Sequence, residues 1–254
     1  MKFVVFRKNT LKVLFVLALV CVCLGVNIVG SPLSVVYFNQ TPRLVPIYNV
    51  ETTEKQVAIT FDSAWGADKT QGILDLLKEY NVGATFFLVG FWVDKYPELV
   101  KAIDEQGIEI GTHSNTHPDF AKLSAEQMEL ELTTSMEKIT AITGKKVELF
   151  RAPFGSYNNT MLNITKELGL TTIQWDVDTL DWKGLTGTQI LDRVMSKVQN
   201  GSIILCHNNS DNILDALRLM LDRLTTAGYK ITSVGDLIIK EDYYIDHAGV
   251  QRKK

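Results

Sequence analysis

Two short polar segments each follow an apolar run in this sequence, and both contain residue types that act in catalysis or metal binding. Thr60–Asp62 ends one run, and His113–His117 ends another about fifty residues later. A carboxylate can act as a general base, and two neutral imidazoles are good ligands for a divalent transition metal. Together the two signals predict a metal-dependent hydrolase.

These signals must be positioned by regular elements, and the sequence alternates apolar runs with amphipathic stretches from Gln56 onward. A chain of 254 residues with 46% hydrophobic residues can hold one large α/β domain with a genuine core. The alternation predicts parallel βα units. The predicted strands are Val57–Phe61, Thr85–Val89, Ile108–Gly111, Glu148–Arg151, Thr172–Asp176 and Ser202–Leu205.

Polar residues recur at the carboxyl ends of these predicted strands. They are Asp62, His113, Arg151, Asp178 and His207. In a βα barrel the carboxyl ends of the strands form the face that carries the active site. We therefore expect these side chains to lie near one another.

One predicted helix has a clear beginning and end. Ser124 followed by Gln127 is a capping-box pattern, and Gly144 follows the last apolar position. The periodic face between them, which we expect to pack in the core, consists of Met128, Leu132, Met136 and Ile139.

The first thirty residues differ from the rest of the chain. Lys2, Arg7, Lys8 and Lys12 precede an almost unbroken apolar run over 13–30, which is close to the length that spans a bilayer. The charge pattern places residues 1–12 in the cytoplasm and the rest outside the cell membrane. No small-x-small cleavage site follows, so we predict an uncleaved anchor; cleavage would give a secreted protein.

Residues 31–55, which include three prolines, are predicted to be a stalk, and 241–254 a polar tail. Four of the 26 basic residues lie before the apolar run, which leaves 22 against 29 acidic residues, a formal charge of −7. Such a charge disfavours a nucleic-acid partner. Only Cys206 lies beyond the apolar run, so that part of the chain has no internal disulfide.

Five motifs in order resemble the polysaccharide deacetylases of the NodB-homology type, carbohydrate esterase family 4. They are Thr60–Asp62, His113–His117, Arg151–Gly155, Asp178–Trp182 and Leu205–His207. The resemblance covers roughly residues 55 to 240, and we place the domain at 56–240. Ser63–Gly66 looks like the sporulation-associated, PdaB-like branch of the family.

The resemblance implies a distorted (β/α) barrel that removes N-acetyl groups from an amino-sugar polymer. Peptidoglycan of the cell wall or spore cortex fits a membrane-anchored protein best. His113 and His117 would bind a divalent metal, with zinc expected and cobalt or another transition metal as the alternative. Asp62 would be the base, and Arg151 matches the family residue that orients it.

The same resemblance assigns the remaining site residues. His207 would be the general acid, and Asp181 occupies the position expected to pair with it and tune its pKa. Phe154 stands where the family usually has tyrosine, and its backbone amide is the expected contact to the oxyanion. Trp182 and Leu205 would shape the acetyl pocket.

Ser63 departs from the family pattern, which has a second aspartate there as a third metal ligand. Three outcomes follow: a metal held by two histidines and water, Asp62 recruited as a ligand, or a catalytically weak wall-binding domain. Because the acid and base residues persist, we favour retained hydrolysis.

Two alternatives remain open from sequence. A noncatalytic carbohydrate-binding or sporulation protein could keep the fold without the chemistry, and an esterase for O-acetyl groups of a glycan would use the same residues. A serine hydrolase is disfavoured because the chain contains no Gly-x-Ser-x-Gly sequence.

Overall fold

The computed structural model describes residues 12–20 and 42–254. Residues 12–20 are helical, and no helix within the two described ranges is long and apolar enough to cross a bilayer. Residues 21–30 of the predicted membrane span lie outside the described residues, as do nearly all of 1–12 and the first part of the predicted stalk. The membrane anchor therefore stays a prediction.

Parallel strands form one curled sheet that carries the polar strand ends. Its order is β6-β5-β4-β3-β2-β8-β7, with β9 pairing with β2, and all of these pairs are parallel. The strands are β2 Gln56–Ser63, β3 Thr85–Leu88, β4 Glu109–Thr112, β5 Leu149–Phe150, β6 Thr171–Thr172, β7 Val177–Asp178, β8 Ile203–His207 and β9 Lys230–Thr232.

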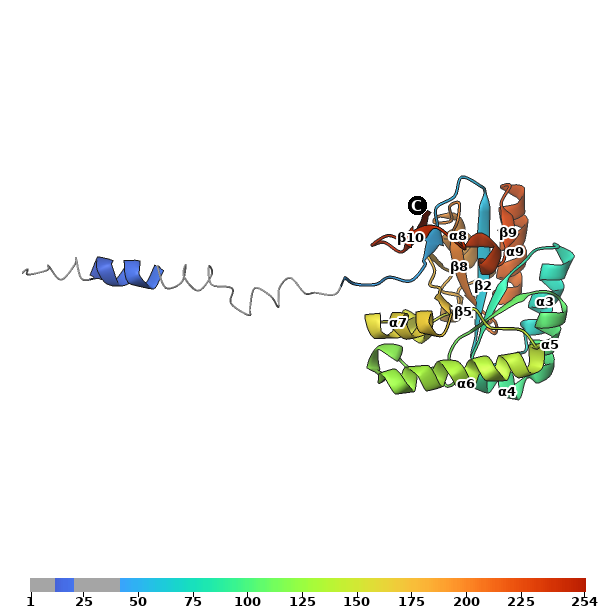
Figure 1. Ribbon diagram of the computed structural model, residues 1–254. Coiled ribbons are helices and arrows are strands. Elements are labelled where there is room, and N and C mark those ends of the chain that lie inside the picture. The colour runs from blue at the N-terminus through green and yellow to red at the C-terminus, as the bar shows by residue number, and fades with distance from the viewer. Residues whose placement is uncertain (1–11, 21–41) are drawn as a thin grey trace, which may run out of the picture. The chain divides into compact units, whose positions relative to one another are not determined.

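Helices cover the outside of the curl (Figure 1). They are α3 Thr70–Glu79, α4 Gly90–Lys95, α5 Pro97–Glu105, α6 Ala125–Thr143, α7 Asn159–Glu167, α8 Gly187–Met195 and α9 Ile213–Thr226. The short helix α10 Val234–Leu237 packs instead with Ala58 and Phe87 on the inner side. The fold is thus α/β, and the barrel expected from the sequence takes the form of a curled parallel half-barrel.

The central strand β2 divides the core between its two faces. Val57, Ile59 and Phe61 pack in the larger cluster against the helices, whereas Ala58 packs in a smaller inner cluster. Because side chains alternate along a strand, Thr60 and Asp62 lie on the same face as Ala58. On this inner face of β2, the apolar side chain of Ala58 is therefore followed by the polar side chains of Thr60 and Asp62 toward the carboxyl end of the strand.

The capping box predicted for α6 is confirmed. Ser124 Oγ accepts a hydrogen bond from the Gln127 amide, and Gln127 Oε1 accepts one from the Ser124 amide. Gly144 ends the helix with φ 68°, in the left-handed region that glycine adopts without strain. Met128, Leu132 and Ile139 are buried, and Met136 is partly buried against the same cluster.

The folded unit extends beyond both predicted boundaries and begins at Leu44. The segment predicted as a stalk contains β1 Asn49–Val50, and the predicted tail contains β10 Tyr243–Ile245 and β11 Val250–Lys253. These strands form a second sheet in the order β1-β11-β10. The reason is that Ile47 and Val50 are buried in the inner cluster, which fixes this segment against the domain.

The predicted strand Thr172–Asp176 is wrong as a single element. The chain leaves β6 after Thr172 and enters β7 at Val177, at the opposite end of the sheet order. Asp176 accepts hydrogen bonds from Asn49 Nδ2, Ser202 Oγ and the Ile203 amide along this crossing. The other predicted strands differ from the observed ones by only a few residues.

Candidate active site

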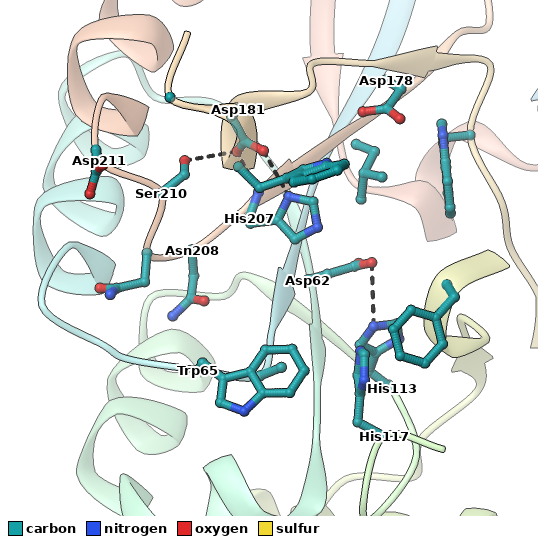
Figure 2. Close-up of a pocket in the computed structure, with 17 residues that line it drawn as sticks. Asp62, Trp65, His113, His117, Asp178, Asp181, His207, Asn208, Ser210 and Asp211 are labelled. Carbon is teal, nitrogen blue, oxygen red and sulfur yellow. Dashed lines mark hydrogen bonds and ion pairs between the residues drawn. The ribbon is translucent and has the colours of Figure 1, made fainter. Parts of the chain in front are cut away.

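The polar residues at the strand ends converge on a pocket of about 750 Å³. Asp62 comes from β2, His207 from β8, and His113 and His117 from the loop after β4. Figure 2 shows Asp62 between His207 and the two histidines of this loop. The pocket is lined by eight of the nine predicted site residues: Asp62, His113, His117, Phe154, Asp181, Trp182, Leu205 and His207.

Arg151, the ninth predicted residue, is fully buried behind Asp62. Its Nη1 donates to Asp62 Oδ1 at 2.8 Å and to Thr60 Oγ1 at 2.7 Å, and its Nη2 donates to the Gln174 carbonyl at 3.0 Å. The guanidinium also stacks over the Phe87 ring, 4.2 Å from its centroid. These contacts fix the guanidinium on one oxygen of Asp62.

Asp62 is held as a carboxylate. Burial raises the pKa of Asp62, but the charge of Arg151, together with its hydrogen bond, lowers it by more. The pKa of this carboxyl therefore lies below its ordinary value, and Asp62 is ionised at neutral pH. Because Asp62 Oδ1 accepts the hydrogen bond from Arg151, Asp62 Oδ2 is the oxygen that can accept a proton from a molecule in the pocket.

His113 is held in one tautomer by the backbone of Arg151. Its Nδ1 lies 2.7 Å from the Arg151 carbonyl, which can only accept, so Nδ1 carries the proton. Burial lowers the pKa of His113, so the ring is neutral and Nε2 has a free lone pair. That Nε2 lies 3.5 Å from Asp62 Oδ2, which places two acceptor atoms face to face.

His117 is the second neutral imidazole of the pocket. Burial, and then the neighbouring His113, lowers the pKa of His117 to about 4. The two imidazole centroids are 4.9 Å apart, and the Phe154 and Trp65 rings each lie 4.7 Å from His117. Both histidines thus offer a lone pair rather than a positive charge.

Ser63 adds no ligand to this pair of histidines. Its side chain is fully buried, and its Oγ finds no hydrogen-bond partner in the described part of the chain. Within residues 12–20 and 42–254 there is no group of three His, Cys, Asp or Glu side chains placed to hold a metal ion. The donor set fits a divalent metal as a two-histidine site with its other positions open.

His207 faces Asp62 and is paired with a buried carboxylate. Its Nδ1 lies 2.7 Å from Asp181 Oδ1, while Asp181 Oδ2 accepts from the His207 amide at 2.7 Å and from Ser210 Oγ at 3.0 Å. Burial lowers the pKa of His207, but the hydrogen bond and charge of Asp181 raise it by more. The net result is a raised pKa, which favours the protonated imidazole.

Three large aromatic side chains stand exposed at this pocket. Trp65, Phe154 and Trp182 are 66%, 70% and 59% exposed. Leu205, by contrast, is buried and lines the pocket. Exposed aromatic rings that surround polar groups are typical of a ligand-binding pocket.

Sequence reasoning missed several lining residues, among them Trp65, Trp175 and Asn208. Trp65 follows Asp62 by three residues and Asn208 follows His207 directly, so their places just beyond the strand ends were available as a signal. Trp175 lies in the crossing between β6 and β7 and had no such signal.

The family profile of polysaccharide deacetylases matches residues 49–173. The peptidoglycan-N-acetylmuramic acid deacetylase PdaA of Bacillus subtilis is 34% identical over 199 residues, which cover 77% of this chain and 76% of PdaA. The peptidoglycan-N-acetylglucosamine deacetylase PgdA of Listeria monocytogenes is 33% identical over 76% of this chain. This chain spans 41% of PgdA and 60% of the uncharacterized YlxY of Bacillus subtilis.

Solved structures share the fold. A family 4 carbohydrate esterase pseudoenzyme from Bacillus anthracis superposes with a TM-score of 0.74 at 36% identity, over 78% of this chain and 70% of that one. A mutant of that pseudoenzyme has restored enzymatic activity. The Bc1960 peptidoglycan N-acetylglucosamine deacetylase also gives a TM-score of 0.74, at 31% identity, over 76% of this chain and 92% of that one.

The pairing of His207 with Asp181 can be tested by NMR titration. In Asp181→Asn we expect the pKa of His207 to fall. The hydrogen bond and negative charge of Asp181 offset the lowering of this pKa by burial, and the substitution weakens the bond and removes the charge. The His207 resonance is assigned from its absence in His207→Gln. Asp178→Asn is the comparison variant, because Asp178 lines the same pocket without bonding to His207 and its charge raises the pKa of His207 by less, so this pKa should fall by less than in Asp181→Asn.

The same pair predicts a pH dependence of stability. Because the folded-state pKa of His207 is raised, its stabilisation is fully present below the unfolded-state pKa of about 6.5 and is lost as pH rises through the folded-state pKa. The difference in unfolding free energy between wild type and Asp181→Asn should therefore be largest at acidic pH. An unchanged His207 pKa in Asp181→Asn would contradict the assignment.

Proposed function

This chain belongs to the polysaccharide deacetylase family, and we propose that it hydrolyses N-acetyl groups of an amino-sugar polymer, with peptidoglycan as the substrate. The main support for the proposal is that a base and an acid face each other across one pocket. Arg151 holds Asp62 as a carboxylate, and Asp181 raises the pKa of His207, which favours its protonated form. Amide hydrolysis requires a base that takes a proton from water and an acid that gives one to the leaving nitrogen, and a lowered pKa at Asp62 and a raised pKa at His207 suit these two roles.

The chain's own residues can be assigned to the steps. Asp62 accepts a proton from the attacking water, whose oxygen bonds to the acetyl carbon. His207 then donates a proton to the nitrogen as the carbon–nitrogen bond breaks, which gives acetate and a free amine. The backbone amide of Phe154, held at φ 60° beside the pocket, is proposed to donate to the oxyanion.

His113 and His117 are proposed to hold a divalent metal ion, zinc by preference and cobalt as a substitute, which would polarise the acetyl carbonyl and the water. The fixed tautomer of His113 supports this assignment, because a ligating histidine usually donates its other ring N–H to a carbonyl or carboxylate. Both rings are neutral, as metal ligands must be.

The exposed aromatic rings support a carbohydrate substrate. Trp65, Phe154 and Trp182 surround the acid and base residues, and aromatic faces pack well against the apolar faces of sugar rings. PdaA and PgdA act on peptidoglycan by their names. The apolar run 13–30 and the Ser63–Gly66 motif support, as part of the proposal, a membrane-anchored protein that acts outside the membrane during sporulation.

A second candidate is a noncatalytic protein that binds wall carbohydrate. It is favoured by Ser63, which supplies no carboxylate beside the histidines, and by the pseudoenzyme of Bacillus anthracis with the same fold. The persistence of both charge pairs favours catalysis, because binding alone does not need a buried base and a paired acid.

Acetate release decides between these candidates. The purified protein is stripped with a chelator and assayed on peptidoglycan and on N-acetylglucosamine oligomers, before and after addition of zinc or cobalt. We expect release that returns with metal and that falls about 100-fold or more in Asp62→Asn, because the base is lost while the shape is kept. No release from folded protein with either metal would favour the binding function.

Replacing Ser63 by aspartate tests the two-histidine site. A carboxylate at this position should tighten zinc binding at least about 10-fold, since even indirect partners of ligands change metal affinity by that factor. Without metal, Ser63→Asp should be less stable than wild type, because an unpaired carboxylate is then buried. Zinc should reverse this loss. Ser63→Asn has the same shape as aspartate without the charge, so it should not tighten zinc binding, and zinc should not reverse its loss of stability. Equal zinc affinity in all three proteins would argue against a metal at these histidines.

A further inference from the structure

The loop that carries His113 and His117 is held by one face of α6. Glu131, Ser135 and Lys138 follow a helical spacing that places them on the same side of the helix. Each of them contacts the segment 112–116. None of the three lines the pocket.

Glu131 makes the most contacts of the three. Its Oε2 accepts from the Asn115 amide at 2.9 Å and from the Thr116 amide at 2.7 Å, and its Oε1 accepts from Thr116 Oγ1 at 2.5 Å. One carboxylate thus satisfies two successive backbone N–H groups and a hydroxyl. Hydrogen bonds to an ionised acceptor are about twice as strong as neutral ones.

The backbone of this loop needs such an anchor. Ser114 and His117 have φ values of 74° and 61°, in the left-handed region that costs residues with a side chain roughly 1 kcal/mol or more. Between these two positions lie Asn115 and Thr116, whose amides point at Glu131. The strain at both ends of the segment is therefore opposed by hydrogen bonds at its centre.

Lys138 and Ser135 of the same face hold the segment at two further points. Lys138 Nζ donates to Asn115 Oδ1 at 2.8 Å and to Asp94 Oδ2 at 2.6 Å. Ser135 Oγ lies 2.6 Å from Thr112 Oγ1, which also accepts from the Ser114 amide at 3.2 Å. Contacts within the protein thus hold this loop conformation.

We propose that Glu131 is a positioning residue that holds His113 and His117 in their ligand-binding arrangement in the metal-free protein. The consequence for zinc rests on the proposed function. Position 63 supplies no carboxylate to add affinity for the metal. Two histidines then bind a metal well only if their loop is already ordered, so that binding does not have to offset the cost of ordering it. Loss of the Glu131 anchor then weakens metal binding without removing a ligand.

The test compares Glu131→Gln with Glu137→Gln in the full chain. Glu137 is an exposed residue of the same helix, so its variant makes the same chemical change away from the loop. Two measurements are made: hydrogen exchange of the Asn115 and Thr116 amides in metal-free protein, and the zinc Kd by calorimetry. Thermal unfolding of both variants reports whether the fold is kept.

We expect Glu131→Gln to speed exchange of both amides about 10-fold or more and to weaken zinc binding about 10-fold. Glu137→Gln should match wild type in both measurements. Unprotected Asn115 and Thr116 amides in wild type would overturn the proposal even if Glu131→Gln failed to fold. Zinc affinity within twofold of wild type in a folded Glu131→Gln protein would also overturn it.

The exchange measurement separates this proposal from the proposed function. A wild-type protein that binds no zinc, but loses amide protection in Glu131→Gln, would contradict the metal-dependent function while supporting the anchoring of the loop.

Discussion

The buried ion pair between Arg151 and Asp62 is the contact on which the rest of the site depends. Arg151 is fully buried, and its guanidinium joins Thr60 and Asp62 of β2 to the Gln174 carbonyl beyond β6. Its own carbonyl accepts from His113. A single residue therefore orients the carboxylate and fixes the tautomer of the neighbouring imidazole. Removal of one partner from such a buried pair typically costs about 3 to 5 kcal/mol, because the other charge is left uncompensated.

The same design recurs on the other side of the pocket with the charges reversed. Asp181 is buried, holds the ring of His207 at Nδ1, and accepts from the His207 amide as well. In each pair, the more deeply buried partner favours the charged form of the group that faces the pocket. Next to Asp62, on the side away from His207, lie two neutral imidazoles on a loop that α6 holds by hydrogen bonds. The site thus combines fixed charges with a preformed ligand pair, although Ser63 supplies no third acidic ligand.

The sequence predicted the parts of this site that depend on local pattern. Strand periodicity placed Asp62 and His207 at the carboxyl ends of strands, and the motif order matched the family. The sequence did not predict that residues 173–176 cross from β6 to β7, because Ile47 and Asn49, which are distant in sequence, fix this segment. The predicted polar tail is a pair of strands for the same reason, since β11 pairs with β1. Glu131 was likewise hidden, because its role depends on how α6 packs against the histidine loop.

A double-mutant cycle between Asp62 and Arg151 tests most directly whether this ion pair organises the site. The unfolding free energies of wild type, Asp62→Asn, Arg151→Met and the double variant are measured by urea denaturation in metal-free buffer at neutral pH. We predict that each single variant loses stability and that the double variant loses less than the sum, with a coupling energy of about 1 to 3 kcal/mol. Additivity within about 0.5 kcal/mol would contradict the account, because independent sites behave in that way.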